Sequence, residues 1–122
     1  MQSNTFLLYG ANGYAGELIA RYARQFELQP ILAGRNKEVI ESLANKLQLP
    51  FRVLDWNDEA ASLVALMEVK AVIHAAGPFQ FTAKQMIEAC LKTGTHYLDI
   101  NGDIAVFELI KRYDSAAKKA GI

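Results

Sequence analysis

The chain has 122 residues, the size of one domain, and 52% of them are hydrophobic while 21% are charged, which excludes a disordered class. Thirteen basic and thirteen acidic residues give a formal net charge of zero, so we expect no nucleic-acid partner and no membrane surface. Cys90 is the one cysteine and cannot form an intramolecular disulfide, so we expect a reducing, cytoplasmic location.

A glycine-rich stretch separates a short apolar run, residues 5–9, from a segment of helical periodicity at residues 14–26. Its spacing is G-x-x-G-x-x-G, a variant of the dinucleotide-binding fingerprint. Glycine permits a sharp turn out of a strand and close approach of a pyrophosphate, which the free N–H groups of the helix N-terminus then bind. A tight turn without a ligand is the alternative. The candidate cofactor-binding residues are Gly10, Asn12, Gly13, Tyr14 and Gly16.

Further apolar runs alternate with segments of helical periodicity along the rest of the chain. Asn36, Asp58 and Thr82 are candidate N-caps of the intervening helices. A last helix is expected over residues 104–119, with a break near Tyr113. The run at residues 71–75 is almost wholly apolar, which is typical of a strand buried on both faces. The runs predict strands at residues 29–33, 51–54, 71–75 and 96–100.

Five strand–helix repeats predict an α/β fold with a doubly wound parallel sheet of the Rossmann type. We expect a three-layer α/β/α arrangement with the strand order 3-2-1-4-5. The order then reverses between the first and fourth strands, so a ligand crevice is predicted there, at the carboxyl ends of the strands.

The loop after the second predicted strand distinguishes the two nicotinamide dinucleotides. NAD sites carry an acidic residue about 20 residues beyond the glycines, where it holds the ribose hydroxyls. This chain has Arg35 at that place and no acidic neighbour. A guanidinium suits a 2′-phosphate, so the sequence favours NADP(H) over NAD(H). A solvated surface arginine is the alternative.

Two further loops supply candidate cofactor contacts. Asp55, after the third strand, could accept a hydrogen bond from the adenine amino group, or it could start a turn with Asn57 and Asp58. The loop after the fourth strand has small residues that permit close approach of the cofactor, and Phe79 and Phe81 offer apolar surface near the nicotinamide end. A plain turn is again the alternative. The candidates in this loop are Ala76, Gly77, Pro78 and Phe79.

The titratable residues suggest no catalytic group. His74 lies inside an apolar strand and is expected to be a core histidine rather than a ligand, and Cys90 lies on the apolar face of a helix. Of His96 and Asp99, only Asp99 is near a carboxyl end. No metal-binding spacing, G-x-S-x-G elbow or Tyr-x-x-x-Lys pair is present in the sequence, so the catalytic residues stay unknown and no metal is expected.

Four segments together resemble the saccharopine dehydrogenase-like oxidoreductases, including the trans-acting enoyl reductases. They are Gly-Ala-Asn-Gly-Tyr-Ala-Gly at 10–16, Leu-Ala-Gly-Arg-Asn at 32–36, Ala-Ala-Gly-Pro-Phe at 75–79 and Gly-Thr-His-Tyr-Leu-Asp at 94–99. The resemblance implies that the first segment holds the pyrophosphate, that the Gly-Arg turn selects NADP(H) and that the Gly-Pro-Phe loop borders the cofactor. Where the family often has Gly-Glu, this chain has Asn101-Gly102-Asp103, which leaves the role of Asp103 in question.

Members of that family are much longer than this chain. We therefore expect residues 1–122 to be an NAD(P)-binding Rossmann domain, the N-terminal part of an oxidoreductase that passes hydride to a small-molecule substrate held by a missing C-terminal domain. Alone, it should bind nucleotide without turnover and self-associate through an exposed sheet edge or face. The alternative is a non-catalytic module that senses NADP(H).

Overall fold

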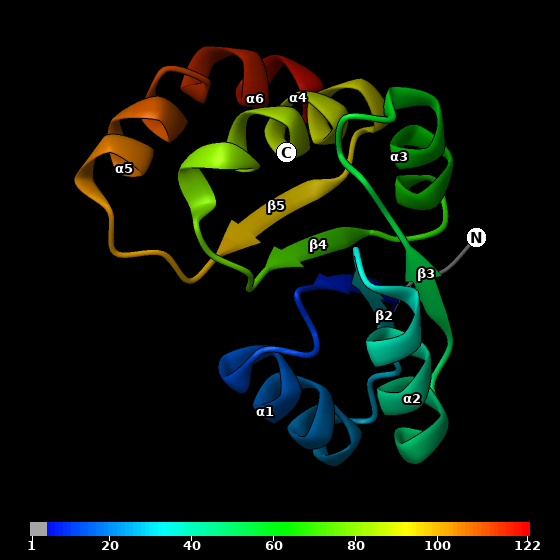
Figure 1. Ribbon diagram of the computed structural model, residues 1–122. Coiled ribbons are helices and arrows are strands. Elements are labelled where there is room, and N and C mark those ends of the chain that lie inside the picture. Colours follow the sequence, from blue (N-terminus) through cyan, green and yellow to red (C-terminus); the bar gives the residue numbers. More distant parts are fainter. Residues whose placement is uncertain (1–4) are drawn as a thin grey trace.

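A computed structural model describes residues 5–122 (Figure 1). The sheet is wholly parallel, with the order β3-β2-β1-β4-β5, and helices lie on both faces, which confirms the predicted Rossmann-type fold. The strands are β1 (Phe6–Tyr9), β2 (Ile31–Gly34), β3 (Phe51–Val53), β4 (Ala71–His74) and β5 (His96–Asp99). The α-helices are α1 (Tyr14–Ala23), α2 (Lys37–Leu47), α3 (Glu59–Leu66), α4 (Ala83–Thr93), α5 (Ile104–Lys111) and α6 (Asp114–Ala120).

Alternate side chains of the strands point to opposite faces and build two cores. Leu8 and Leu32 pack with α1 and α2 on one face, whereas Leu7 and Val72 pack with α3 and α4 on the other. In Figure 1, α5 and α6 lie on the same side of the sheet as α4. Among the described residues, no helix has both the length and the apolar character needed to cross a membrane.

The helix ends follow the predicted signals in most places. Asn36 Oδ1 accepts from Val39 N at 3.2 Å, and Asp58 Oδ1 accepts from Ala61 N at 3.2 Å, so both residues cap helices as expected. The chain breaks between α5 and α6 as predicted. The first helix is shorter than predicted, because α1 ends at Ala23 and a 3-10 turn (Arg24–Phe26) follows it.

The prediction for Thr82 as a cap is wrong. This residue occupies the N-cap position of α4, but its side chain makes no capping hydrogen bond. The hydroxyl instead lies 2.8 Å from a ring nitrogen of the buried His74. The Thr82 side chain therefore forms a hydrogen bond with the buried imidazole, which needs a polar partner, and does not cap α4.

The prediction that residues 71–75 form a strand buried on both faces is also wrong. Val72 and His74 are buried on the α4 side of β4, but Ala71 and Ile73 are only half-buried. Their face of β4 and β5 borders an apolar groove of about 540 Å³, which α1 closes on one side. The second half of the sheet therefore has an uncovered apolar face.

Candidate cofactor-binding site

Three loops meet in a crevice at the carboxyl ends of β1, β2 and β4, at the predicted place. The crevice encloses about 270 Å³. Tyr9 pairs with Ala33 on one side and with His74 on the other, so the three strands end level and their loops converge. The predicted residues that line the cavity are Gly10, Asn12, Arg35, Ala76, Gly77 and Pro78. Phe81, which was expected to offer apolar surface there, also lines the cavity. Lining residues that the sequence did not single out for it are Tyr9, Gly34, Asn36 and Thr82.

Gly10 joins the three strand ends. Its φ of +86° lies in the left-handed region, and its N–H donates to Ala33 O at 2.8 Å. A Cβ on Gly10 would lie 2.4 Å from the Cβ of Ala76, which is far inside van der Waals contact. The first and fourth loops therefore touch backbone to backbone, and glycine is required for that approach.

The other two glycines of the motif have different roles. A Cβ on Gly16 would lie 2.2 Å from Gly10 O, so Gly16 allows α1 to pack against the turn. A Cβ on Gly13 would meet only Gly10 O, at 3.4 Å, and Gly13 is exposed. The fold thus demands glycine at position 16 but leaves open space at position 13. The first N–H groups of any α-helix lack an intrahelical partner, and in α1, which begins at Tyr14, no capping side chain accepts from them.

Arg35 follows β2 at the edge of this crevice. Its side chain is exposed, and within residues 5–122 it forms no salt bridge. Burial raises the pKa of Tyr9 at the crevice floor, and the nearby positive charge of Arg35 acts in the opposite direction. Arg35 thus places an uncommitted guanidinium beside the crevice.

Five predicted residues do not line the cavity, namely Gly13, Tyr14, Gly16, Asp55 and Phe79. Asp55 forms the turn that was its alternative role, because its Oδ1 accepts from Asn57 N at 3.0 Å and its carbonyl accepts from Asp58 N at 2.9 Å. Phe79 packs over the ring of His74, with the ring centroids 4.4 Å apart, whereas Phe81 lines the crevice. An adenine contact of Asp55 stays a prediction, as do direct cofactor contacts of Phe79, Gly13, Tyr14 and Gly16.

His74 is a buried core histidine, as predicted, and it belongs to a chain of hydrogen bonds. Its Nδ1 lies 2.9 Å from Tyr97 Oη and its Nε2 lies 2.8 Å from Thr82 Oγ1. Burial lowers the pKa of His74 to about 4, against the smaller opposing effects of the Asp99 charge and a backbone contact with Ala76. The imidazole is therefore neutral at physiological pH.

Beyond Tyr97 the chain of hydrogen bonds reaches the loop after β5. Tyr97 Oη donates to Asp99 Oδ2 at 2.9 Å, and the Asn101 amide donates to Asp99 Oδ1 at 2.7 Å. Asp103 accepts from Ala105 N at 2.8 Å as the N-cap of α5, which gives this residue a structural role. These side chains do not line the crevice, and they are connected to it through His74 and Thr82. The sequence did not predict this connection, because it joins residues of different elements.

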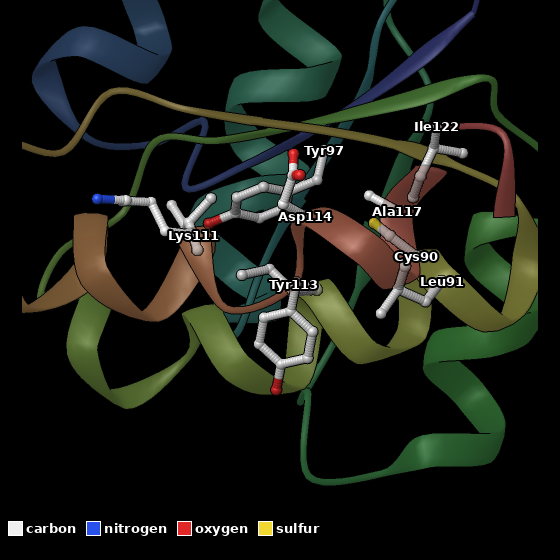
Figure 2. A pocket seen from close by; sticks show the side chains of 10 residues that line it. Cys90, Leu91, Tyr97, Lys111, Tyr113, Asp114, Ala117 and Ile122 are labelled. Atoms are coloured by element: carbon white, nitrogen blue, oxygen red, sulfur yellow. The ribbon is translucent and has the colours of Figure 1, made fainter. Parts of the chain in front are cut away.

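A larger cavity, of about 570 Å³, lies between α4, β5 and α5–α6 (Figure 2). Its walls are mostly apolar, and they include Cys90, the ring of Tyr97 and Ile122. Burial raises the pKa of the Cys90 thiol to about 12, so this thiol is unreactive and packs in the core as predicted. The cavity shares no lining residue with the crevice at the glycine turn, so it is not the candidate cofactor site.

Within residues 5–122, no three side chains of His, Cys, Asp or Glu are grouped so that they could hold a metal ion. The polar side chains that line the crevice belong to Tyr9, Asn12, Arg35, Asn36 and Thr82. Such a set can bind a phosphorylated ligand and orient it. Its one phenol, that of Tyr9, is buried and has a raised pKa.

Comparison with known proteins identifies the family. A saccharopine dehydrogenase-like oxidoreductase of Bos taurus is 26% identical over 134 residues, which cover 93% of this chain and 31% of the relative. A trans-acting enoyl reductase of Mycobacterium ulcerans is 27% identical over 105 residues, which cover 80% of this chain and 25% of the relative. The chain thus spans less than a third of the length of these relatives.

The fold has counterparts among solved structures. That of saccharopine dehydrogenase (L-Glu forming) from Saccharomyces cerevisiae superposes with a TM-score of 0.71 at 23% identity, covering 88% of this chain and 24% of that protein. The sequence profile of the saccharopine dehydrogenase NADP-binding domain matches residues 6–122, which is nearly the whole chain. The resemblance inferred from the four segments is thereby confirmed, and the chain belongs to the family of saccharopine dehydrogenase NADP-binding domains.

Proposed function

We propose that the chain binds NADP(H) in preference to NAD(H), as the cofactor-binding unit of a saccharopine dehydrogenase-like oxidoreductase. The observation that carries this proposal is the crevice in which the glycine turn, Arg35 and the loop 76–78 line one cavity. The pyrophosphate would lie against the N-terminus of α1, over Gly13, where the fold leaves space. The guanidinium of Arg35 would hold the 2′-phosphate through charge-assisted hydrogen bonds.

The reaction of the complete protein is part of the proposal. Relatives of more than three times the matched length are named as oxidoreductases, which favours hydride transfer over a purely sensory role. In residues 5–122, the histidine nearest the crevice, His74, is buried and neutral, so we expect this chain alone to bind nucleotide without turning over a substrate. A substrate-binding part would have to lie outside the matched region.

The decisive experiment is a calorimetric titration of the chain with NADPH and NADH. We expect tighter binding of NADPH and a loss of about 1.5–3 kcal/mol in NADPH binding for Arg35→Ala, the scale of hydrogen bonds to a charged group. NADH binding should hardly change in that variant. Lys37→Ala removes a neighbouring exposed cation that does not line the cavity, so it is the matched control.

Gly13→Val tests the pyrophosphate position separately. The added side chain should fill open space rather than disturb the fold, so it should block both dinucleotides while the thermal unfolding temperature stays close to that of the parent. Equal affinity of the parent chain for NADPH and NADH would overturn the proposed preference. Undiminished binding by Gly13→Val would overturn the proposed pose.

A further inference from the structure

The hydrogen bonds around His74 have a fixed direction. A carboxylate can only accept hydrogen bonds, so Tyr97 must donate its single hydroxyl hydrogen to Asp99. The Tyr97 oxygen can then only accept from His74 Nδ1, which therefore carries the imidazole proton. Burial and the hydrogen bond to Asp99 raise the pKa of Tyr97, so its hydroxyl stays protonated.

The same reasoning determines the direction in which the Thr82 hydroxyl hydrogen points. Because His74 is neutral and protonated at Nδ1, its Nε2 is an acceptor, and the hydroxyl hydrogen of Thr82 points to it at a donor–acceptor distance of 2.8 Å. Thr82 also lines the crevice beside the loop 76–78. With its hydrogen held by the core, the hydroxyl can offer only its lone pairs to a ligand.

Thr82 lies on the β4 side of the crevice, on the opposite side of the glycine turn from Arg35. A Rossmann-type sheet binds the two nucleotides of the cofactor on its two halves, with the pyrophosphate at the turn between them. If Arg35 takes the adenosine 2′-phosphate, the nicotinamide nucleotide lies on the side of Thr82. That nucleotide has two kinds of neutral hydrogen-bond donor, the ribose hydroxyls and the carboxamide N–H₂ group.

We propose that the Thr82 hydroxyl accepts a hydrogen bond from a neutral donor of the nicotinamide half of the dinucleotide, and that His74, Tyr97 and Asp99 are positioning residues that hold it in this orientation. This inference rests on the proposed NADP(H) function. The Thr82 hydroxyl makes no capping hydrogen bond to α4, so its lone pairs are free for a ligand.

The orientation is tested first without any ligand. Long-range ¹H–¹⁵N NMR spectra of the intact chain distinguish the two neutral tautomers of His74, and we expect the proton on Nδ1. A proton on Nε2 would reverse the direction of the hydrogen bonds, make Thr82 a donor and overturn the inference.

The contact is tested with three ligands: NADP⁺, 2′-phospho-ADP-ribose, which lacks the nicotinamide ring, and 2′,5′-ADP, which lacks the whole nicotinamide half. We expect Thr82→Val to weaken NADP⁺ binding about three- to tenfold, the value of one neutral hydrogen bond, and to leave 2′,5′-ADP unchanged. A loss retained with 2′-phospho-ADP-ribose assigns the donor to the ribose, and a loss seen only with NADP⁺ assigns it to the carboxamide.

Matched variants separate this role from a structural one. Thr82→Ser keeps the hydroxyl and should bind NADP⁺ like the parent, and Tyr97→Phe should weaken NADP⁺ by a smaller factor because His74 loses its fixed tautomer. Thr93→Val removes a hydroxyl that donates to Ala89 O on the same helix, away from the crevice, and should change no affinity. Unfolding temperatures of all variants are measured alongside.

The two proposals fail in different ways. If the parent chain binds none of the three ligands, the NADP(H) function is overturned and the inference with it. If the parent binds NADP⁺ and Gly13→Val does not, but Thr82→Val binds as the parent does, only the contact of Thr82 is overturned. An equal loss of NADP⁺ and 2′,5′-ADP in Thr82→Val would likewise overturn it.

Discussion

Helices cover the two halves of the sheet to different degrees. The first half consists of β1, β2 and β3, and the second half consists of β4 and β5. In the first half, all four residues of β2 are buried, because α1 and α2 cover one face and the α3 side covers the other. In the second half, buried and half-buried residues alternate along β4, and β5 has no buried residue. In Figure 1, α1 and α2 lie on one side of the sheet at β1 and β2, whereas the helices beside β4 and β5 lie on the other side, with α4.

This difference separates the tasks of the two halves. The well-packed half holds the glycine turn and Arg35, which need a rigid backbone to meet a phosphorylated ligand. The second half carries the polar chain from Thr82 to Asp99 on its covered face and the apolar groove on its bare face. The candidate site lies where the halves join, so ligand binding would draw on both.

The close contact between Gly10 and Ala76, where the loops after β1 and β4 meet, should be the point at which a substitution destabilises the fold most. Gly10→Ala combines a left-handed backbone, which costs about 1–2 kcal/mol for an L-residue, with a forced approach to Ala76 that adds about 1–3 kcal/mol. We expect a loss of about 2–5 kcal/mol in the free energy of unfolding, measured by urea denaturation.

A matched variant isolates the contact. Gly94 has a similar φ of +71°, but a Cβ there would meet nothing within 4 Å. Gly94→Ala should therefore cost only the backbone share, about 1–2 kcal/mol. Adding Ala76→Gly to Gly10→Ala should recover part of the loss. Equal losses in the free energy of unfolding for Gly10→Ala and Gly94→Ala would show that there is no steric contact between position 10 and Ala76.

The polar chain of the second half should make stability depend on pH. His74 has an ordinary pKa of 6.5, and burial lowers it to about 4 in the folded chain, so the unfolded chain binds more protons between these values. The free energy of unfolding therefore rises with pH in this range. We expect about 2 kcal/mol to be lost on going from pH 7 to 5, and about 3 kcal/mol by pH 4, through His74 alone.

The share of His74 can be separated from that of other groups. Urea denaturation of His74→Gln should show a flatter dependence of the free energy of unfolding on pH between pH 7 and 5 than the parent chain shows. An NMR titration measures the pKa of His74 in the folded chain directly. A folded-state midpoint for His74 near 6.5 would contradict the expected shift, even if His74→Gln proved too unstable to compare.

The fold could be predicted because its signals are local. The alternation of apolar runs with helical periodicity, the caps at Asn36 and Asp58, and the break near Tyr113 depend on residues a few positions apart. The crevice followed from topology, because the carboxyl ends of parallel strands meet at one edge. Such features need no knowledge of which side chains touch.

Apart from the early end of α1, the errors concern contacts between different elements of the fold. The apolar residues 71–75 are also compatible with a strand that has one bare face, because the sequence does not state whether a helix covers it. Thr82 has the residue type and place of a cap, but its partner His74 lies eight residues earlier on another element. The positions of the two rings of the 3-10 turn (Phe79–Phe81) could not be predicted either, because Phe79 packs on the buried His74 whereas Phe81 lines the crevice.

The bare face of the second half should govern how the chain associates. We propose that two copies meet through the apolar groove, whose rim includes Tyr22, Phe26 and Leu98 with exposed fractions of 53%, 71% and 52%. Leu98→Glu places a charge on this face and should raise the dissociation constant at least tenfold, a change of about 1.4 kcal/mol, as measured by sedimentation velocity. Val64→Glu adds the same charge to an exposed site on α3, outside the groove, and should associate like the parent. A parent chain that is monomeric throughout the micromolar range would contradict the proposal, and an equal effect of both variants would move the interface away from the groove.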